Sequence, residues 1–243
     1  MATIKYKKIR TDKPVFTVAL TTLLTFLLLF FVPVKSFGIK PIWWLYPNIL
    51  LAIIWFEYHI RLKSDNSEDE SSQLLLRCVL FGCATTGTYL PLDWLFSRRV
   101  QFIVYHSLDF FGNVTTPIAI ILSWVIFGTV YVYCYHRLRM CGIHPFVTSI
   151  ITGGAAAIGS VIIYALGKEL WVWNPLRLEN IPNIASVPIF VPITYMLTFT
   201  LYPYYFHGKQ HPLIAGIRCG LFLGIVMFLS FLIFRRIPNP SLG

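Results

Sequence analysis

One carboxylate is conspicuous because of what surrounds it. Asp93 lies in the stretch Leu-Pro-Leu-Asp-Trp-Leu-Phe, residues 90–96, where no adjacent side chain carries a positive charge. A carboxyl group held in an apolar pocket has a raised pKa and can then deliver a proton as a general acid. The alternative is an ordinary carboxylate at a membrane interface, paired with Arg98 or Arg99. The chemistry that this stretch predicts is acid catalysis on an apolar substrate.

Glu169 has comparable surroundings near the end of another apolar run. Aligning the two runs brings Glu169 and Trp171 close to Asp93 and Trp94. Both carboxylates begin long predicted loops on the same side of a membrane, so we expect them to lie near each other. Asp93 and Glu169 are therefore the first two candidate catalytic residues.

Glu57 is a third candidate catalytic residue, because it lies inside the apolar run 41–60. An acidic residue inside a membrane span often handles protons, since a charge there is costly without a function or a partner. His59 or Arg61 would be its ordinary partner.

Two arginines, Arg77 and Arg218, also lie inside apolar runs. A long cationic side chain can extend from such a position to the membrane interface. Alternatively, both could bind an anionic head group of a substrate, such as a diphosphate. No aspartate-rich metal-binding motif accompanies them, which argues against metal-dependent diphosphate chemistry.

Most histidines fall near the predicted inner ends of the apolar runs. His136, His144, His207 and His211 resemble the histidine boxes of membrane di-iron oxygenases in their spacing alone, and no two of them adjoin. These four histidines offer an alternative metal site. The acid chemistry predicted for Asp93 requires no metal and no cofactor. Otherwise they cap turns, with each His-Pro pair starting the next helix.

The composition predicts that lipid surrounds this chain. Of its 243 residues, 56% are hydrophobic and only 12% are charged, and several apolar runs exceed the length that crosses a bilayer, about 20 helical residues. The predicted fold class is an all-α integral membrane protein with seven transmembrane helices. The predicted spans are 15–34, 41–60, 74–92, 115–135, 145–166, 186–206 and 212–234.

Charge sets the predicted orientation. The basic leader, residues 1–14, precedes the first span and places the amino terminus in the cytoplasm, with the carboxyl terminus on the opposite side. The net charge of +10 is spread through short loops, so we expect contact with membrane lipid and no binding of nucleic acid. The five cysteines form no C-x-x-C motif and are expected to be small buried side chains.

An internal repeat organises the predicted spans. Residues 117–136 match residues 188–207 without a gap: both segments begin with Pro-Ile, share tyrosine positions and end in histidine. A fainter copy begins at Pro41. We therefore predict a single polytopic membrane domain over 1–243, with one anchor helix followed by three helical hairpins in parallel orientation. The repeat units are about 41–92, 115–166 and 186–234, and a site is expected near their common axis.

Part of the chain, residues 89–206, resembles the polytopic carotenoid enzymes, which include the lycopene-cyclase-domain proteins and the membrane carotenoid hydratases. The shared features are an acidic residue at a span end followed by tryptophan, and then Ile181-Pro182-Asn183 before the next span. The Pro-x-Glu-Glu element of the cyclases is absent.

The resemblance implies that a carboxyl group protonates a terminal double bond of an isoprenoid polyene, after which a ring closes or water adds. It also implies that aromatic faces stabilise the carbocation. The substrate-binding residues so implied are Trp94, Trp171, Trp173, Tyr131, Tyr202 and Asn183.

Four functions are compatible with the sequence. The first is a cofactor-independent enzyme that acts on an apolar, isoprenoid-like small molecule by acid chemistry. The second is a transporter or lipid-handling protein, which the parallel repeats and the prolines within spans favour. The third is a scaffold subunit without chemistry, and a histidine-rich, metal-dependent oxidoreductase is a further enzymatic alternative.

Overall fold

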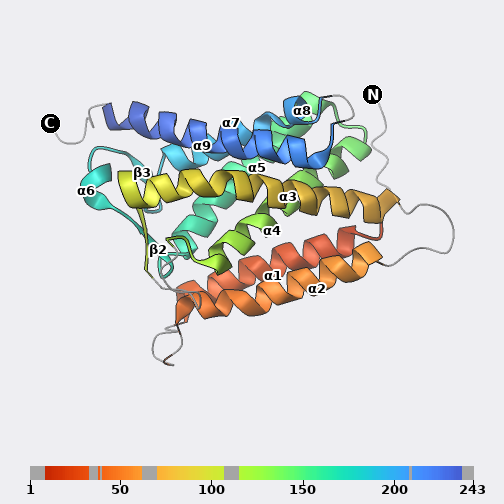
Figure 1. The fold of residues 1–243 in the computed structure, drawn as a ribbon, viewed down its shortest axis with the longest axis horizontal. Coiled ribbons are helices and arrows are strands. Elements are labelled where there is room, and N and C mark those ends of the chain that lie inside the picture. Colours follow the sequence, from red (N-terminus) through yellow and green to blue (C-terminus); the bar gives the residue numbers. More distant parts are fainter. Residues whose placement is uncertain are drawn as a thin grey trace.

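The fold is a bundle of helices that run side by side, with the short strands gathered at one end of the bundle (Figure 1). The computed structural model describes residues 9–32, 38, 40–61, 70–106, 115–207 and 210–236. The helices are α1 (Asp12–Phe31), η2 (Pro41–Trp44), α2 (Leu45–Arg61), α3 (Glu70–Leu95), η3 (Phe96–Val100), α4 (Ile118–Met140), α5 (Pro145–Leu166), α6 (Pro175–Leu178), α7 (Phe190–Thr200), α8 (Tyr202–Tyr205) and α9 (Pro212–Arg236). The strands are β1 (Ile103–Tyr105), β2 (Trp171–Trp173), β3 (Asn183–Ile184) and β4 (Val187–Pro188).

Five of these helices are long and apolar enough to cross a membrane. They are α1, α3 with its extension η3, α4, α5 and α9. The chain is therefore an all-α, multi-pass membrane protein, as the composition predicts. Helix α1 begins at one end of the bundle and α9 ends at the other (Figure 1). Which end faces the cytoplasm stays a prediction.

Two of the seven predicted spans are shorter or interrupted. Span 41–60 consists of the single turn η2 followed by α2, which has 17 residues. Span 186–206 begins with β4, and its helix α7 has only 11 residues. The helix is interrupted at Leu201, and the short helix α8 follows with Pro203 in its first turn. Proline lacks the N–H that a continuous helix needs, which explains why the apolar run does not form one helix.

The closest helix packing occurs between members of different predicted hairpins. Helix α3 packs most extensively against α9 and α4, and α5 packs against α7. Glycines permit this approach: a Cβ atom added at Gly216 would lie 2.6 Å from the carbonyl oxygen of Phe81 and 2.7 Å from the Cβ of Ala84. Gly216, Gly220 and Gly224 repeat every four residues along the face of α9 that meets α3. The division into three repeated hairpins stays a prediction.

A buried ion pair fixes the start of α1 to the end of α4. The Arg137 guanidinium donates from Nε to Asp12 Oδ1 at 2.6 Å and from Nη2 to Oδ2 at 2.8 Å. The Tyr133 hydroxyl donates to the same carboxylate at 2.8 Å. Bidentate pairing of this kind compensates for the cost of removing both charges from water. Asp12 is not recognisable from the sequence as a partner of Arg137, because it lies in the basic leader.

The glycine contacts predict the effect of single substitutions. Gly216→Ala should lower the free energy of unfolding by about 1–3 kcal/mol, because the added methyl group collides with backbone of α3. The matched control is Gly87→Ala in α3, where an added Cβ has no neighbour within 4 Å. It should be neutral or should stabilise the helix by up to about 1 kcal/mol. Denaturant titration in detergent micelles measures both changes, and equal effects would contradict the packing described.

Candidate functional site

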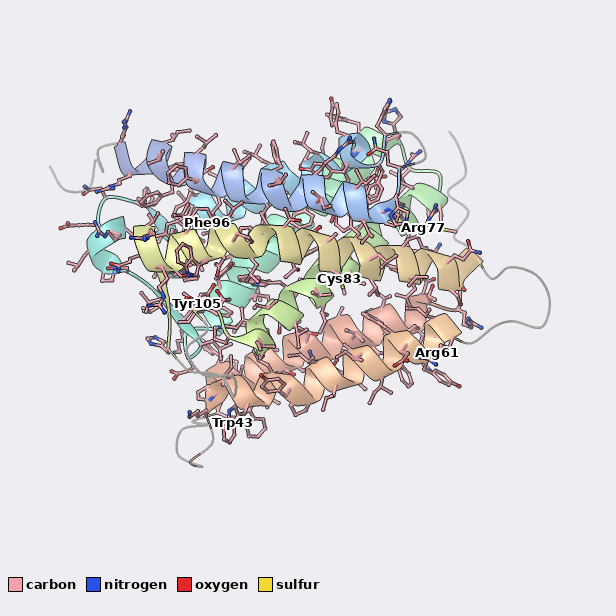
Figure 2. The ribbon with its side chains drawn as sticks, in the orientation of Figure 1. Trp43, Arg61, Arg77, Cys83, Phe96 and Tyr105 are labelled. Carbon is pink, nitrogen blue, oxygen red and sulfur yellow. The ribbon has the colours of Figure 1, made fainter. Side chains whose placement is uncertain are left out.

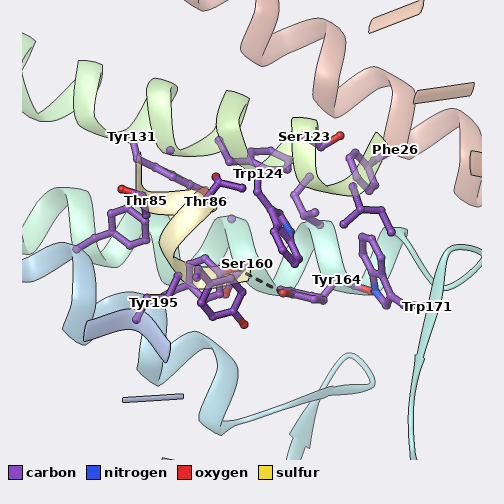
Figure 3. Close-up of a pocket in the computed structure, with 18 of the residues that line it drawn as sticks. Phe26, Thr85, Thr86, Ser123, Trp124, Tyr131, Ser160, Tyr164, Trp171 and Tyr195 are labelled. Carbon is purple, nitrogen blue, oxygen red and sulfur yellow. Dashed lines mark hydrogen bonds between the residues drawn. The ribbon is translucent and has the colours of Figure 1, made fainter. Parts of the chain in front are cut away.

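A central cavity lies between the helices and is lined mainly by aromatic side chains (Figure 3). Every long helix contributes to its wall. The lining includes Phe26 of α1, Leu45 of α2, Thr85, Thr86 and Tyr89 of α3, Ile120, Ser123, Trp124, Phe127, Gly128 and Tyr131 of α4, Gly159, Ser160, Ile163 and Tyr164 of α5, Trp171 of β2, Tyr195 and Phe199 of α7, and Leu223 of α9. The prediction of a site near the common axis of the three repeats stays a prediction.

The cavity is narrow and presents few free polar groups. It leaves about 760 Å³ between protein atoms, part of it open to the outside, yet the centre of a water molecule can occupy only about 60 Å³. The hydroxyl of Ser123 donates to the Ala119 carbonyl and that of Ser160 to the Ala157 carbonyl, at 2.8 and 2.7 Å. Because these hydroxyls are satisfied by their own helices, the walls suit a slender apolar ligand.

Asp93 lies just beyond one end of this cavity. Its side chain is 2% exposed, and it follows the cavity residue Tyr89 by one helical turn on the same face of α3. The Tyr105 hydroxyl donates to Oδ1 at 2.9 Å, and the Thr116 hydroxyl donates to Oδ2 at 2.5 Å. Among the described residues, hydroxyl groups hold this carboxylate, whereas Arg98 donates to Thr115 instead.

A reversal of the chain brings Tyr105 to Asp93. Helix α3 continues as the π-helical turn η3, and Gln101 then adopts a left-handed conformation with φ 60°. The strand β1 follows at this end of the bundle, where Figure 2 shows Phe96 at the end of α3 and Tyr105 below it, with Arg77 toward the opposite end of the helix. Burial, with the Asp93 carboxylate as the next cause, raises the pKa of Tyr105 well above its usual value. Tyr105 therefore remains a hydrogen-bond donor.

Strand pairing joins the two loops that carry the predicted carboxylates. Strands β1 and β2 are antiparallel, with Tyr105 opposite Trp171. The Trp171 indole closes the end of the cavity and donates from Nε1 to the Tyr164 carbonyl at 3.2 Å. A Cβ atom at Gly167 would collide with this indole, so the turn before β2 needs glycine. The pairing therefore places Trp171 opposite Tyr105, the residue that donates a hydrogen bond to Asp93.

The three candidate acids differ in their burial. Glu169 lies partly exposed in the turn between α5 and β2, and it does not line the cavity. Glu57 lies on an exposed face of α2, where it forms an ion pair with Arg61 at 2.5 Å, the ordinary partner that the sequence offered. Of the three candidates, only Asp93 is buried beside the cavity.

The predicted aromatic residues have different positions. Trp171 and Tyr131 line the cavity. Trp94 is 48% exposed on the outside of α3. Tyr202 is fully buried and packs against Phe81 and the cavity residue Phe199, but it does not itself line the cavity.

A separate, more polar pocket at the strand end of the bundle accounts for two further predicted residues. Trp173 and Asn183 both line it, and Asn183 is exposed. The rings of Trp173 and Tyr164 are 5.1 Å apart, so this pocket adjoins the end of the central cavity.

The predicted arginines and histidines lie outside the cavity. Arg77 and Arg218 are exposed, and Arg218 donates to Gln210 at 2.6 Å. His144 and His211 accept hydrogen bonds from the backbone N–H two residues later, which confirms that each His-Pro pair starts a helix. His136 packs against Phe206, and His207 is exposed. Within the described ranges, no three metal-ligating side chains come together.

Several residues of the site were not predicted from the sequence. Thr85, Tyr89 and Asp93 are spaced by four residues and therefore share one helix face, which was a readable signal. Trp124, Tyr164 and Tyr195 carry no signal of this kind, because aromatic residues are frequent in every span. Thr116 and Tyr105 become recognisable only through the chain reversal at Gln101.

Comparison with known proteins identifies no relative: no family model, no curated protein and no solved structure matches the chain.

The hydrogen bonds to Asp93 predict a coupled stability effect. Thr116→Val should lower the free energy of unfolding by about 1–3 kcal/mol, because it leaves a buried carboxylate oxygen without its donor. The loss should be smaller in the Asp93→Asn background, where no charge remains to be compensated. Denaturant titration of the two single variants and the double variant measures the coupling.

The matched control for this double-mutant cycle of Thr116 and Asp93 is Thr115→Val, one residue earlier and partly exposed. It should have little effect and no coupling to Asp93. If Thr116→Val and Thr115→Val behave alike, the Thr116 hydroxyl does not support the carboxylate.

Proposed function

We propose that this protein is a membrane enzyme that binds a linear, isoprenoid-like polyene in the central cavity and uses Asp93 as the acid that protonates a terminal double bond. The observation that carries the proposal is the position of Asp93. It is a buried carboxyl group one helical turn from the wall of a narrow aromatic cavity. The resemblance to carotenoid cyclases and hydratases supports the same reaction class.

The proposed reaction needs no oxidant, reductant or metal. The proton of the Asp93 carboxyl group is transferred to the less substituted carbon of the terminal C=C unit, and the π electron pair of that unit forms the new C–H bond. A carbocation remains on the neighbouring, more substituted carbon. Either a second C=C attacks this carbon and closes a ring, or water adds to it. Loss of a proton from the ring or from the added water then restores the Asp93 carboxyl group.

The chain offers groups for each part of this reaction. Trp124, Tyr164 and Trp171 present aromatic rings to the end of the cavity nearest Asp93, and aromatic faces stabilise cations by cation–π attraction. Tyr105 and Thr116 hold the carboxylate that forms after proton transfer. The apolar lining excludes bulk water, which would otherwise capture the carbocation without selectivity.

A second candidate function is lipid handling without covalent chemistry. One observation favours it: Asp93 does not itself line the cavity, and both of its oxygens already accept hydrogen bonds. In that case Asp93 would fasten β1 and the start of α4 to α3, and the cavity would carry an apolar molecule unchanged.

The two functions differ in the products that they leave. We would express the protein in a heterologous host that makes lycopene and other linear isoprenoids, and analyse lipid extracts by chromatography and mass spectrometry. The enzyme should yield a cyclised or hydrated product. Asp93→Asn should reduce this product at least about 100-fold, the lower range of general-acid contributions.

The matched control in this experiment is Glu57→Gln, which removes an exposed carboxylate far from the cavity. It should leave the product level unchanged. Unchanged extracts from cells that contain folded wild-type protein would favour the lipid-handling function instead. An equal loss of product in both variants would contradict a specific role for Asp93.

A further inference from the structure

The central cavity adjoins a second hollow between α1, α4 and α5. This lateral hollow is lined by Ala19, Thr22 and Leu23 of α1, Ile126, Phe127, Val130 and Tyr131 of α4, and Gly159, Ile162 and Ile163 of α5. It leaves about 600 Å³ between protein atoms and is partly open. All three helices are among those long and apolar enough to cross a membrane.

The lateral hollow and the central cavity share a wall. Phe127, Tyr131, Gly159 and Ile163 belong to both. The two spaces are therefore separated by the side chains of only a few residues. Gly159 makes this arrangement possible, since an added Cβ atom would collide with the hydroxyl of Tyr131.

The outer rim of the hollow is apolar and exposed. Leu23 is 36% exposed and Ile162 is 42% exposed, and both lie within membrane-spanning helices. The polar atom of Thr22 is already occupied, because it donates to the Val18 carbonyl and accepts from Asn48. An opening with this lining in the middle of spanning helices faces hydrocarbon, so its natural occupant is an apolar chain.

We propose that the lateral hollow is the opening through which an apolar chain enters the central cavity from the bilayer, passing between Phe127 and Tyr131 of α4 and Gly159 of α5. The inference rests on the central cavity as the ligand site of the proposed function, and it is independent of the acid chemistry at Asp93. An isoprenoid dissolved in lipid would slide sideways into the bundle without crossing water. The passage would require rotation of Phe127 and Tyr131, because the Tyr131 hydroxyl occupies the space beside Gly159.

Photolabelling of the purified protein in lipid nanodiscs tests the opening. The probe is geranylgeraniol that carries a diazirine group, added to the lipid at time zero, and peptides labelled after brief irradiation are identified by mass spectrometry. The wild type should acquire label on cavity residues of α4 and α7. Ala19→Trp fills the hollow and should slow this labelling about tenfold or more, whereas labelling of lipid-facing residues should not change.

The matched control is Leu20→Trp, which places the same indole on the next residue of α1, a lipid-exposed position outside the hollow. Its cavity residues should be labelled at the same rate as those of the wild type. A second pair, Ile162→Trp and Ile158→Trp, applies the same comparison on α5 if Ala19→Trp does not fold, since only Ile162 lines the hollow.

The outcomes separate this inference from the proposed function. Equal cavity labelling in Ala19→Trp and Leu20→Trp, or in the α5 pair, would overturn the lateral opening and leave the acid chemistry intact. A slowed rate in the filled variants supports the opening even if no chemical product is ever formed. Absence of cavity labelling in the wild type would overturn the inference directly.

Discussion

The structure depends on a carboxylate that is buried inside a bundle of lipid-spanning helices. A charged group in such surroundings costs several kcal/mol unless donors compensate it. Asp93 receives two hydroxyl donors, Tyr105 and Thr116, and each comes from a different segment. To deliver them, the chain must turn at Gln101 into β1 and later begin α4 at Ile118, two residues after Thr116. The requirement of one side chain therefore fixes how three segments meet at one end of the bundle.

The same arrangement shapes the cavity. Because β1 pairs with β2, the position of Tyr105 also determines that of Trp171, whose indole closes the cavity beside the end of α5. Two glycines are also needed: a side chain at Gly159 would displace Tyr131, and Gly128 of α4 lies against the backbone of Gly82 in α3. The proposed chemistry on a slender apolar molecule is based on the aromatic walls and the nearby carboxyl group of Asp93. A water-soluble, polar substrate would gain little binding free energy from such an apolar lining.

The sequence was informative where a single residue type carries a strong physical constraint. It predicted the membrane class from the apolar runs, Asp93 from the cost of a charge among apolar residues, and the His-Pro helix starts at His144 and His211. It was less informative about span ends, because Pro203 interrupts an apolar run that composition alone counts as one span. The contact between Asp12 and Arg137 joins residues 125 positions apart and could not be read from spacing. Likewise, Gln101 adopts its left-handed conformation without the glycine or asparagine that usually marks one.

The central claim is that Asp93 transfers a proton to a carbon atom of an apolar substrate. Its most direct test uses purified protein in nanodiscs that contain a linear isoprenoid polyene, incubated in deuterated water, with the product analysed by mass spectrometry. The account predicts one deuterium bound to carbon for each protonated double bond, and no labelled product from Asp93→Asn. A product without carbon-bound deuterium, or the same labelling from Asp93→Asn, would contradict it.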